Sequence, residues 1–154
     1  MTLNSKTLHN LSWIPLFLIG VCAIVLGLSW LLVDAPWLLD KAANEAALQM
    51  PFTKLFDADI NQTLPDYLTI VYRFFGLWVL GLGSVICTYL LVTFMGTRRS
   101  RNSILTVLGI ILIILFYLEY TLIPISPFVN LTYGLLALYL VSLWASLKLN
   151  REEK

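Results

Sequence analysis

The chain has 154 residues, of which 59% are hydrophobic and only 12% are charged, and its mean hydropathy is +0.84. Soluble domains carry about a quarter charged residues, so this composition excludes an ordinary water-soluble domain and favours a membrane protein. The net charge of +1 comes without a basic domain or an interleaved aromatic and basic pattern, which argues against a nucleic-acid partner.

Four long apolar segments predict an all-α membrane protein, a single polytopic domain over residues 1–154. The first predicted span covers about residues 11–33, and a more polar outer loop follows over 34–66. The other spans are predicted at about 67–95, 103–123 and 128–147. The second and third are separated by a basic turn, and the third and fourth by a short turn between Pro124 and Pro127. The sequence therefore predicts a four-helix transmembrane bundle.

The loop between the first two spans carries a helical pattern of its own. Asp34 followed by Pro36 is a typical helix start, and Pro51 is a typical stop. Between them the apolar residues recur at helical spacing, which predicts an amphipathic outer helix between spans 1 and 2. This segment is either a cap over a pocket or a connector that lies on the membrane surface.

The placement of lysine and arginine predicts the orientation in the membrane. One side collects both termini and most of the basic residues, namely Lys6, Arg98, Arg99, Arg101, Lys148, Arg151 and Lys154. The opposite loop is mainly acidic. Because basic residues concentrate in cytoplasmic loops, we expect cytoplasmic N- and C-termini and an outward-facing loop. The compact chain, without processing signals, favours the inner (cell) membrane of a bacterium as its location.

Two charged residues interrupt the predicted spans. Counting the helical rise of about 1.5 Å per residue places Arg73 about 31 Å, and Glu119 about 24 Å, from the inner ends of their spans. Both therefore fall in the outer leaflet. Gly76, Gly83 and Cys87 lie within a quarter turn of Arg73, and small residues permit close helix packing. We therefore expect Arg73 to face inward and to meet Glu119.

Polar residues predicted at the same depth complete a candidate site. Asn130 enters from the fourth span, and Tyr72, Tyr120 and Tyr133 lie beside the charged residues in sequence. One interpretation is an outward-facing polar pocket that binds a small polar ligand or a lipid headgroup. The other is a structural ion pair that fixes the helix register, with the tyrosines forming an aromatic belt. The sequence leaves both open.

Catalytic and metal chemistry find little support in the residues. The hydroxyl side chains that could act as nucleophiles have no histidine base, because His9 is predicted on the cytoplasmic side. His9 also has no acidic or thiol neighbour at the spacing of metal ligands. Cys22 and Cys87 lie in apolar segments without a Cys-x-x-Cys pair, so we interpret them as apolar packing residues. We predict no catalytic residues, no metal and no cofactor.

The second span carries Tyr72-Arg73-Phe74-Phe75-Gly76, followed by Gly81-Leu82-Gly83. This short motif, with the chain length and the four-span layout, resembles the small four-helix bacterial membrane proteins of the DoxX-like group. The resemblance implies a four-helix membrane fold more than an activity.

These observations lead to two main hypotheses for function. The first is a non-enzymatic membrane protein that binds a small ligand or lipid, or an accessory subunit of a larger complex, with a membrane-protein partner or a second copy of itself. The second is a small proton-coupled transporter that uses Glu119. A third hypothesis, an enzyme acting on a lipid headgroup, would use Arg73 to hold the phosphate.

Overall fold

The computed structural model describes residues 4–152, and this range is helical without strands. Lys154, which the sequence places in the basic tail, lies outside the described residues. The four long helices are α1 (Ser5–Leu32), α4 (Leu64–Thr93), α5 (Arg98–Leu122) and α6 (Pro127–Glu152). Between α1 and α4 lie the 3-10 helix η1 (Pro36–Asp40), α2 (Lys41–Leu48), α3 (Phe52–Phe56) and the 3-10 helix η2 (Asp59–Asn61). The all-α prediction is confirmed.

The four long helices have the length and composition of membrane spans. They contain 28, 30, 25 and 26 residues, and each includes a strongly apolar window with few charges. At about 1.5 Å per residue, even the shortest exceeds the roughly 30 Å of a bilayer's hydrocarbon core. Large apolar side chains cover much of the outer surface of the bundle, where lipid would meet them. The chain is a multi-pass membrane protein with a four-helix bundle.

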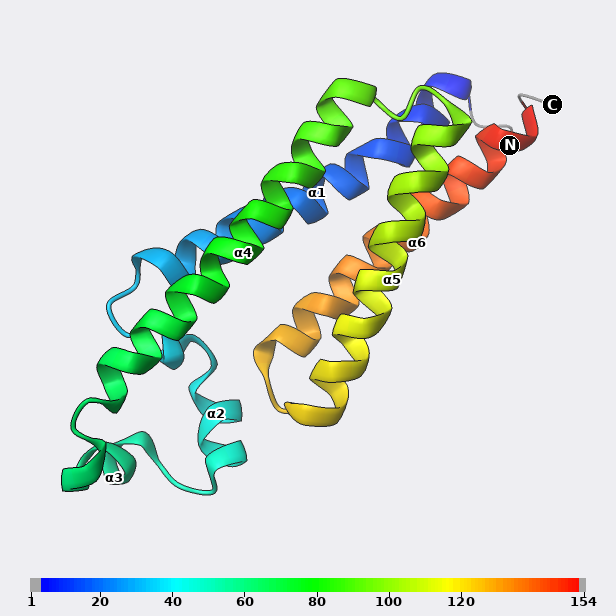
Figure 1. The fold of residues 1–154 in the computed structure, drawn as a ribbon. Helices are drawn as coiled ribbons and strands as arrows, with labels where there is room; N and C mark the ends of the chain where they lie inside the picture. The colour runs from blue at the N-terminus through cyan, green and yellow to red at the C-terminus, as the bar shows by residue number, and fades with distance from the viewer. Residues whose placement is uncertain (1–3, 153–154) are drawn as a thin grey trace.

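The bundle has two distinct ends (Figure 1). At the terminal end, the start of α1 lies beside the end of α6, and Ser5 Oγ donates to Glu152 Oε2 at 3.5 Å. The connector, residues 33–63, lies at the opposite end, which we name the connector end. Helix α1 packs against both α4 and α6, and α5 packs against α6. In Figure 1, α4 and α5 draw apart toward the connector end.

Glycines bring α1 and α4 into close contact. Gly27 faces Gly76 and Leu80, and a Cβ at Gly27 would lie 2.5 Å from the Leu80 nitrogen. Two turns further along, a Cβ at Gly83 would lie 2.6 Å from the Gly20 carbonyl oxygen. Only glycine permits this backbone separation. The predicted small-residue face on the second span is thus confirmed as a packing face.

The core lies toward the terminal end, where all four long helices contribute. Leu16 and Ile19 from α1 pack with buried residues of α4 and α5, including Leu90 and Leu108. Small residues let α6 approach α1, and the Ser142 hydroxyl donates to the Ser12 carbonyl across this contact. The terminal end is therefore closely packed, whereas the connector end is more open.

The connector differs from the single amphipathic helix that we expected. It is divided at Lys41 into η1 and the eight-residue α2, and the Asp34 side chain caps neither. Helix α2 ends at Leu48, and its C-cap Gln49 adopts the left-handed conformation (φ 56°) two residues before Pro51. Asp40 lies on the buried side of η1, with Trp37, and is 6% exposed. The segment is helical as predicted, but it forms two consecutive helices and not one.

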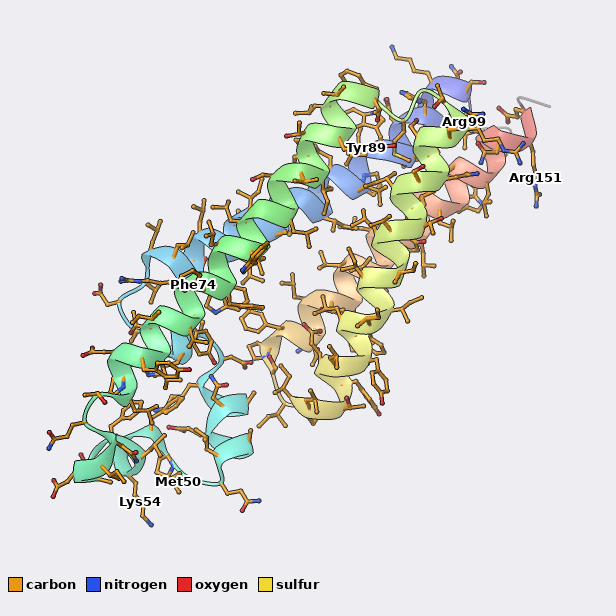
Figure 2. All side chains as sticks on the ribbon, in the orientation of Figure 1. Met50, Lys54, Phe74, Tyr89, Arg99 and Arg151 are labelled. Carbon is orange, nitrogen blue, oxygen red and sulfur yellow. The ribbon has the colours of Figure 1, made fainter. Side chains whose placement is uncertain are left out.

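The basic turn between α4 and α5 is shorter than the predicted loop over 96–102. Thr97 caps α5 in a reciprocal pair of hydrogen bonds with Ser100, so the helix begins at Arg98. As a result Arg101 lies inside the helix and is 1% exposed, whereas Arg98 and Arg99 are exposed. Figure 2 shows Arg99 and Arg151 at the terminal end, opposite Met50 and Lys54 at the connector end.

Candidate functional site

A cavity of about 520 Å³ lies between the four long helices on the connector side of the core. Each helix contributes one face, because the lining residues recur at helical spacing. Most of the lining is apolar. Helix α1 supplies Ile19, Cys22, Ala23, Leu26 and Trp30, α4 supplies Tyr72, Phe75, Val79, Leu82 and Ile86, and α5 and α6 supply the facing residues from Leu108 to Leu135.

Polar residues gather at one end of this cavity. They come from five different elements: Asp40 from η1, Asn44 from α2, Tyr72 from α4, Glu119 from α5 and Thr132 from α6. We name these five residues the polar end. They all belong to the connector side, because Asp40 and Asn44 are themselves part of the connector.

Asp40 joins the connector to the turn between α5 and α6. The Ser126 hydroxyl donates to Asp40 Oδ2 at 2.9 Å, while Asp40 Oδ1 is buried without a hydrogen-bond partner among the described residues. Burial raises the pKa of the Asp40 carboxyl, and the Ser126 hydrogen bond offsets part of that rise. The sequence predicted an amphipathic outer helix over this segment and did not single out Asp40, so its inward position was missed.

Glu119 is the second buried carboxylate of the polar end and is 8% exposed. The hydroxyl of Thr132, itself 2% exposed, hydrogen-bonds this carboxylate from α6. Glu119 Oε2 is buried without a partner in the described part of the chain. Asp40 lies near enough for the two carboxylates to repel each other when both are charged.

Asn44 fixes the position of α2 over the cavity. Its amide nitrogen donates to the Trp37 carbonyl at 3.0 Å and to the Tyr72 hydroxyl at 2.9 Å. Both amide protons are therefore used within the protein. The connector is thus attached both to α4 through Tyr72 and to the α5–α6 turn through Asp40.

Of the six predicted site residues, the structure places Tyr72 and Glu119 in the cavity. The other four do not line it, and all are exposed. Asn130 lies about 200° around α6 from Thr132, so the two face opposite sides of the helix. Tyr120 and Tyr133 both contact the Phe116 ring, with centroids 5.9 and 5.2 Å away.

The expected inward position of Arg73 is wrong. Arg73 is exposed, and it makes no ion pair with Glu119; the ion pair within residues 4–152 joins Lys41 and Glu45 at 3.7 Å. The reason is the length of α1. Gly76 already packs beside Leu31, and α1 ends at Leu32, so Arg73 lies one turn beyond the helix that would have covered it.

A separate groove lies next to the cavity, between α4 and α5 on the outside of the bundle. This groove has a volume of about 200 Å³ and includes Tyr89, Ser103 and Val107. It shares four lining residues with the cavity: Leu82, Ile86, Leu108 and Ile111. Since both helices are membrane spans, the groove faces the lipid, and these four side chains lie between it and the cavity.

The chemistry of the lining limits what the cavity can hold. Its unpartnered buried atoms are two carboxylate oxygens and the Trp30 indole nitrogen. Within residues 4–152, no lysine, arginine or histidine lines it. No group of metal-ligating side chains occurs in the described part of the chain. The arrangement suits an elongated apolar molecule with a polar group at one end.

No protein-family model matches the chain, and the comparisons with curated proteins and with solved structures also give no match. Function is therefore inferred from the cavity and its lining residues.

Proposed function

We propose that the protein binds an amphiphile of the surrounding bilayer, with its tail in the apolar part of the cavity and its head at the polar end. The observation that supports this most is the pair of buried oxygens, Asp40 Oδ1 and Glu119 Oε2, that lack partners at one end of an otherwise apolar space. A buried polar atom without a partner costs about 1–3 kcal/mol. A ligand that supplies the missing partners removes that cost.

The membrane setting supports a lipid-borne ligand over a soluble one. We place the entry of a bilayer tail between α4 and α5, where a lipid-facing groove lies next to the cavity along four shared lining residues. Along α5 the lining runs from Leu108 to Glu119, a length of about 16 Å. This length suits an alkyl chain of the dodecyl class.

Filling the cavity tests this proposal. In phosphatidylcholine nanodiscs, we expect wild-type protein to retain at least one labelled dodecyl probe from a set with amine, alcohol and carboxylate heads. Leu115→Trp places an indole in the cavity and should lower that retention about tenfold or more. The neighbouring Ile114→Trp is a matched control, because Ile114 is 53% exposed and outside the lining. Equal retention by the two variants, or no retention by wild type, would refute the proposal.

A proton-coupled transporter is the second candidate, and the two buried carboxylates beside one cavity are the observation that favours it. The two functions differ in proton flux across liposomes under a pH gradient, recorded with a trapped pH dye. Binding alone predicts no flux from any variant. Flux through wild type that Glu119→Gln abolishes, and that the exposed-carboxylate control Asp66→Asn retains, would select the transporter.

The membrane orientation and the family membership are also proposals. We infer cytoplasmic termini from the exposed basic residues of the terminal end, with the connector outside, in a bacterial inner membrane. In that orientation the polar end faces the outer leaflet. The DoxX-like assignment stays a proposal, based on the short motif of the second span and on the four-span layout. The phosphate-holding hypothesis loses its basis, because Arg73 does not line the cavity.

A further inference from the structure

We infer that the head of the bound amphiphile is a primary ammonium group, held between the carboxylates of Asp40 and Glu119. This inference rests on the proposed amphiphile binding and adds the chemical class of the head. It follows from which hydrogen-bonding groups of the polar end are already used and which are free.

Most of the protein's own donors at the polar end are committed; the exception is Tyr72, which accepts from Asn44 and whose own hydroxyl proton has no acceptor among the described residues. Ser126 gives its hydroxyl proton to Asp40, and Thr132 interacts with Glu119. Asn44 gives both amide protons to Trp37 and Tyr72. The remaining oxygens, Asp40 Oδ1 and Glu119 Oε2, therefore need donors that these neighbours do not supply.

Charge points to the same class. The polar end carries two acidic side chains and no basic one, so an anionic head would be repelled. Lys41 and Arg73, each adjacent in sequence to a polar-end residue, are both exposed, and Lys41 pairs with Glu45. An ammonium group brings a positive charge and several N–H donors on one atom, which fits two acceptors that come from different helices.

The tail alone cannot give selectivity. A bilayer interior is as apolar as the leucine-lined cavity, so moving a tail from lipid into the cavity changes its environment little. Discrimination among membrane amphiphiles therefore comes from the head. The Trp30 indole N–H, also buried without a partner in the described range, offers one donor for an oxygen on the same ligand.

The test compares dodecyl chains that differ only in the head, with immobilised protein in phosphatidylcholine nanodiscs and empty nanodiscs as background. We expect labelled dodecylamine to be retained about tenfold more strongly than dodecanol or dodecanoate, because hydrogen bonds to charged groups are the stronger ones. Dodecyltrimethylammonium, which has the charge but no N–H, should compete poorly. Equal competition by it would overturn the role of the N–H donors.

Variants then connect the selectivity to the two carboxylates. Asp40→Asn with Glu119→Gln should remove the amine preference while the dodecyl alcohol is still retained. Asp66→Asn, an exposed carboxylate of α4, is the matched control and should keep the preference. The comparison of heads on wild type needs no variant, so the inference stays testable even if the double variant fails to fold.

The outcomes separate this inference from the function on which it rests. If all dodecyl heads are retained equally and Leu115→Trp abolishes their retention, the cavity binds tails and the ammonium assignment is wrong. If no probe is retained, both are wrong. Ethylamine, which has the head without the tail, should not displace dodecylamine at equal concentration. Displacement by it would show a soluble amine as the ligand and overturn the lipid-borne assignment.

Discussion

Replacing Arg101 with leucine is expected to lower the free energy of unfolding by about 2–4 kcal/mol, because its hydrogen-bond partners would be left buried without donors. The guanidinium donates Nε and Nη2 to Asn150 Oδ1 at 2.9 and 2.8 Å, and Nη1 to the Met95 carbonyl at 3.1 Å. One side chain thus joins the start of α5, the end of α6 and the α4–α5 turn.

The turn that Arg101 holds is conformationally costly without it. Phe94 and Met95 both adopt left-handed backbone conformations, with φ of 45° and 53°, which residues other than glycine adopt at an energetic cost. The Arg101 contact to the Met95 carbonyl, and the Met95 N–H donation to Thr93 Oγ1 at 3.2 Å, offset that cost. We therefore expect Arg101→Leu to destabilise the α4–α5 turn as well as the contact with Asn150.

The measurement is equilibrium unfolding in mild detergent, followed by tryptophan fluorescence. Arg99→Leu is the matched control, since Arg99 lies in the same first turn of α5 and is exposed. Its change should stay within about 0.5 kcal/mol. Equal losses in the two variants would mean that the charge of this turn, and not the buried hydrogen bonds, stabilises the protein.

The second large effect is expected at the α1–α4 contact. Gly83→Ala should lower the free energy of unfolding by about 1–3 kcal/mol, the usual cost of overpacking. The added Cβ would meet the Gly20 carbonyl oxygen at 2.6 Å and the Ile24 nitrogen at 2.8 Å. These are backbone atoms, so the helices themselves must separate.

Gly81 provides an internal control on the same helix. A Cβ at Gly81 meets nothing within 4 Å, so Gly81→Ala should be neutral or should stabilise by up to about 1 kcal/mol through helix propensity. The same unfolding measurement compares the two variants. If Gly81→Ala destabilises as much as Gly83→Ala, helix flexibility, and not the approach of α1, explains the glycines.

Part of the candidate site could be predicted from the sequence. A glutamate inside an apolar span is costly unless it faces the protein interior, and Glu119 does so. Its partner could not be predicted in the same way, because residue depth and helical angle do not reveal where a neighbouring helix ends. Arg73 shares a face with Gly76, yet α1 ends too early to cover it.

Asp40 and Thr132 were missed for related reasons. Asp40 lies in a connector whose amphipathic pattern indicated a surface position, yet the face that it shares with Trp37 and Ala43 is the buried one. Thr132 is a small polar residue of a span, and such residues often only bond their own helix. The sequence does concentrate polar residues near the ends of three spans. It does not show which faces of these helices contact each other.

The sequence by itself determined the class of protein, the number of spans and the glycine face of α4, because these depend on composition and on periodicity along single helices. Only the tertiary structure decided that α4 and α5 separate to leave a cavity, that Asp40 and Glu119 both line it, and that Arg73 and Asn130 do not. These features depend on where one helix ends beside another and on how the connector folds over the bundle. These positions depend on contacts between segments that are far apart in the chain, so no local sequence pattern determines them.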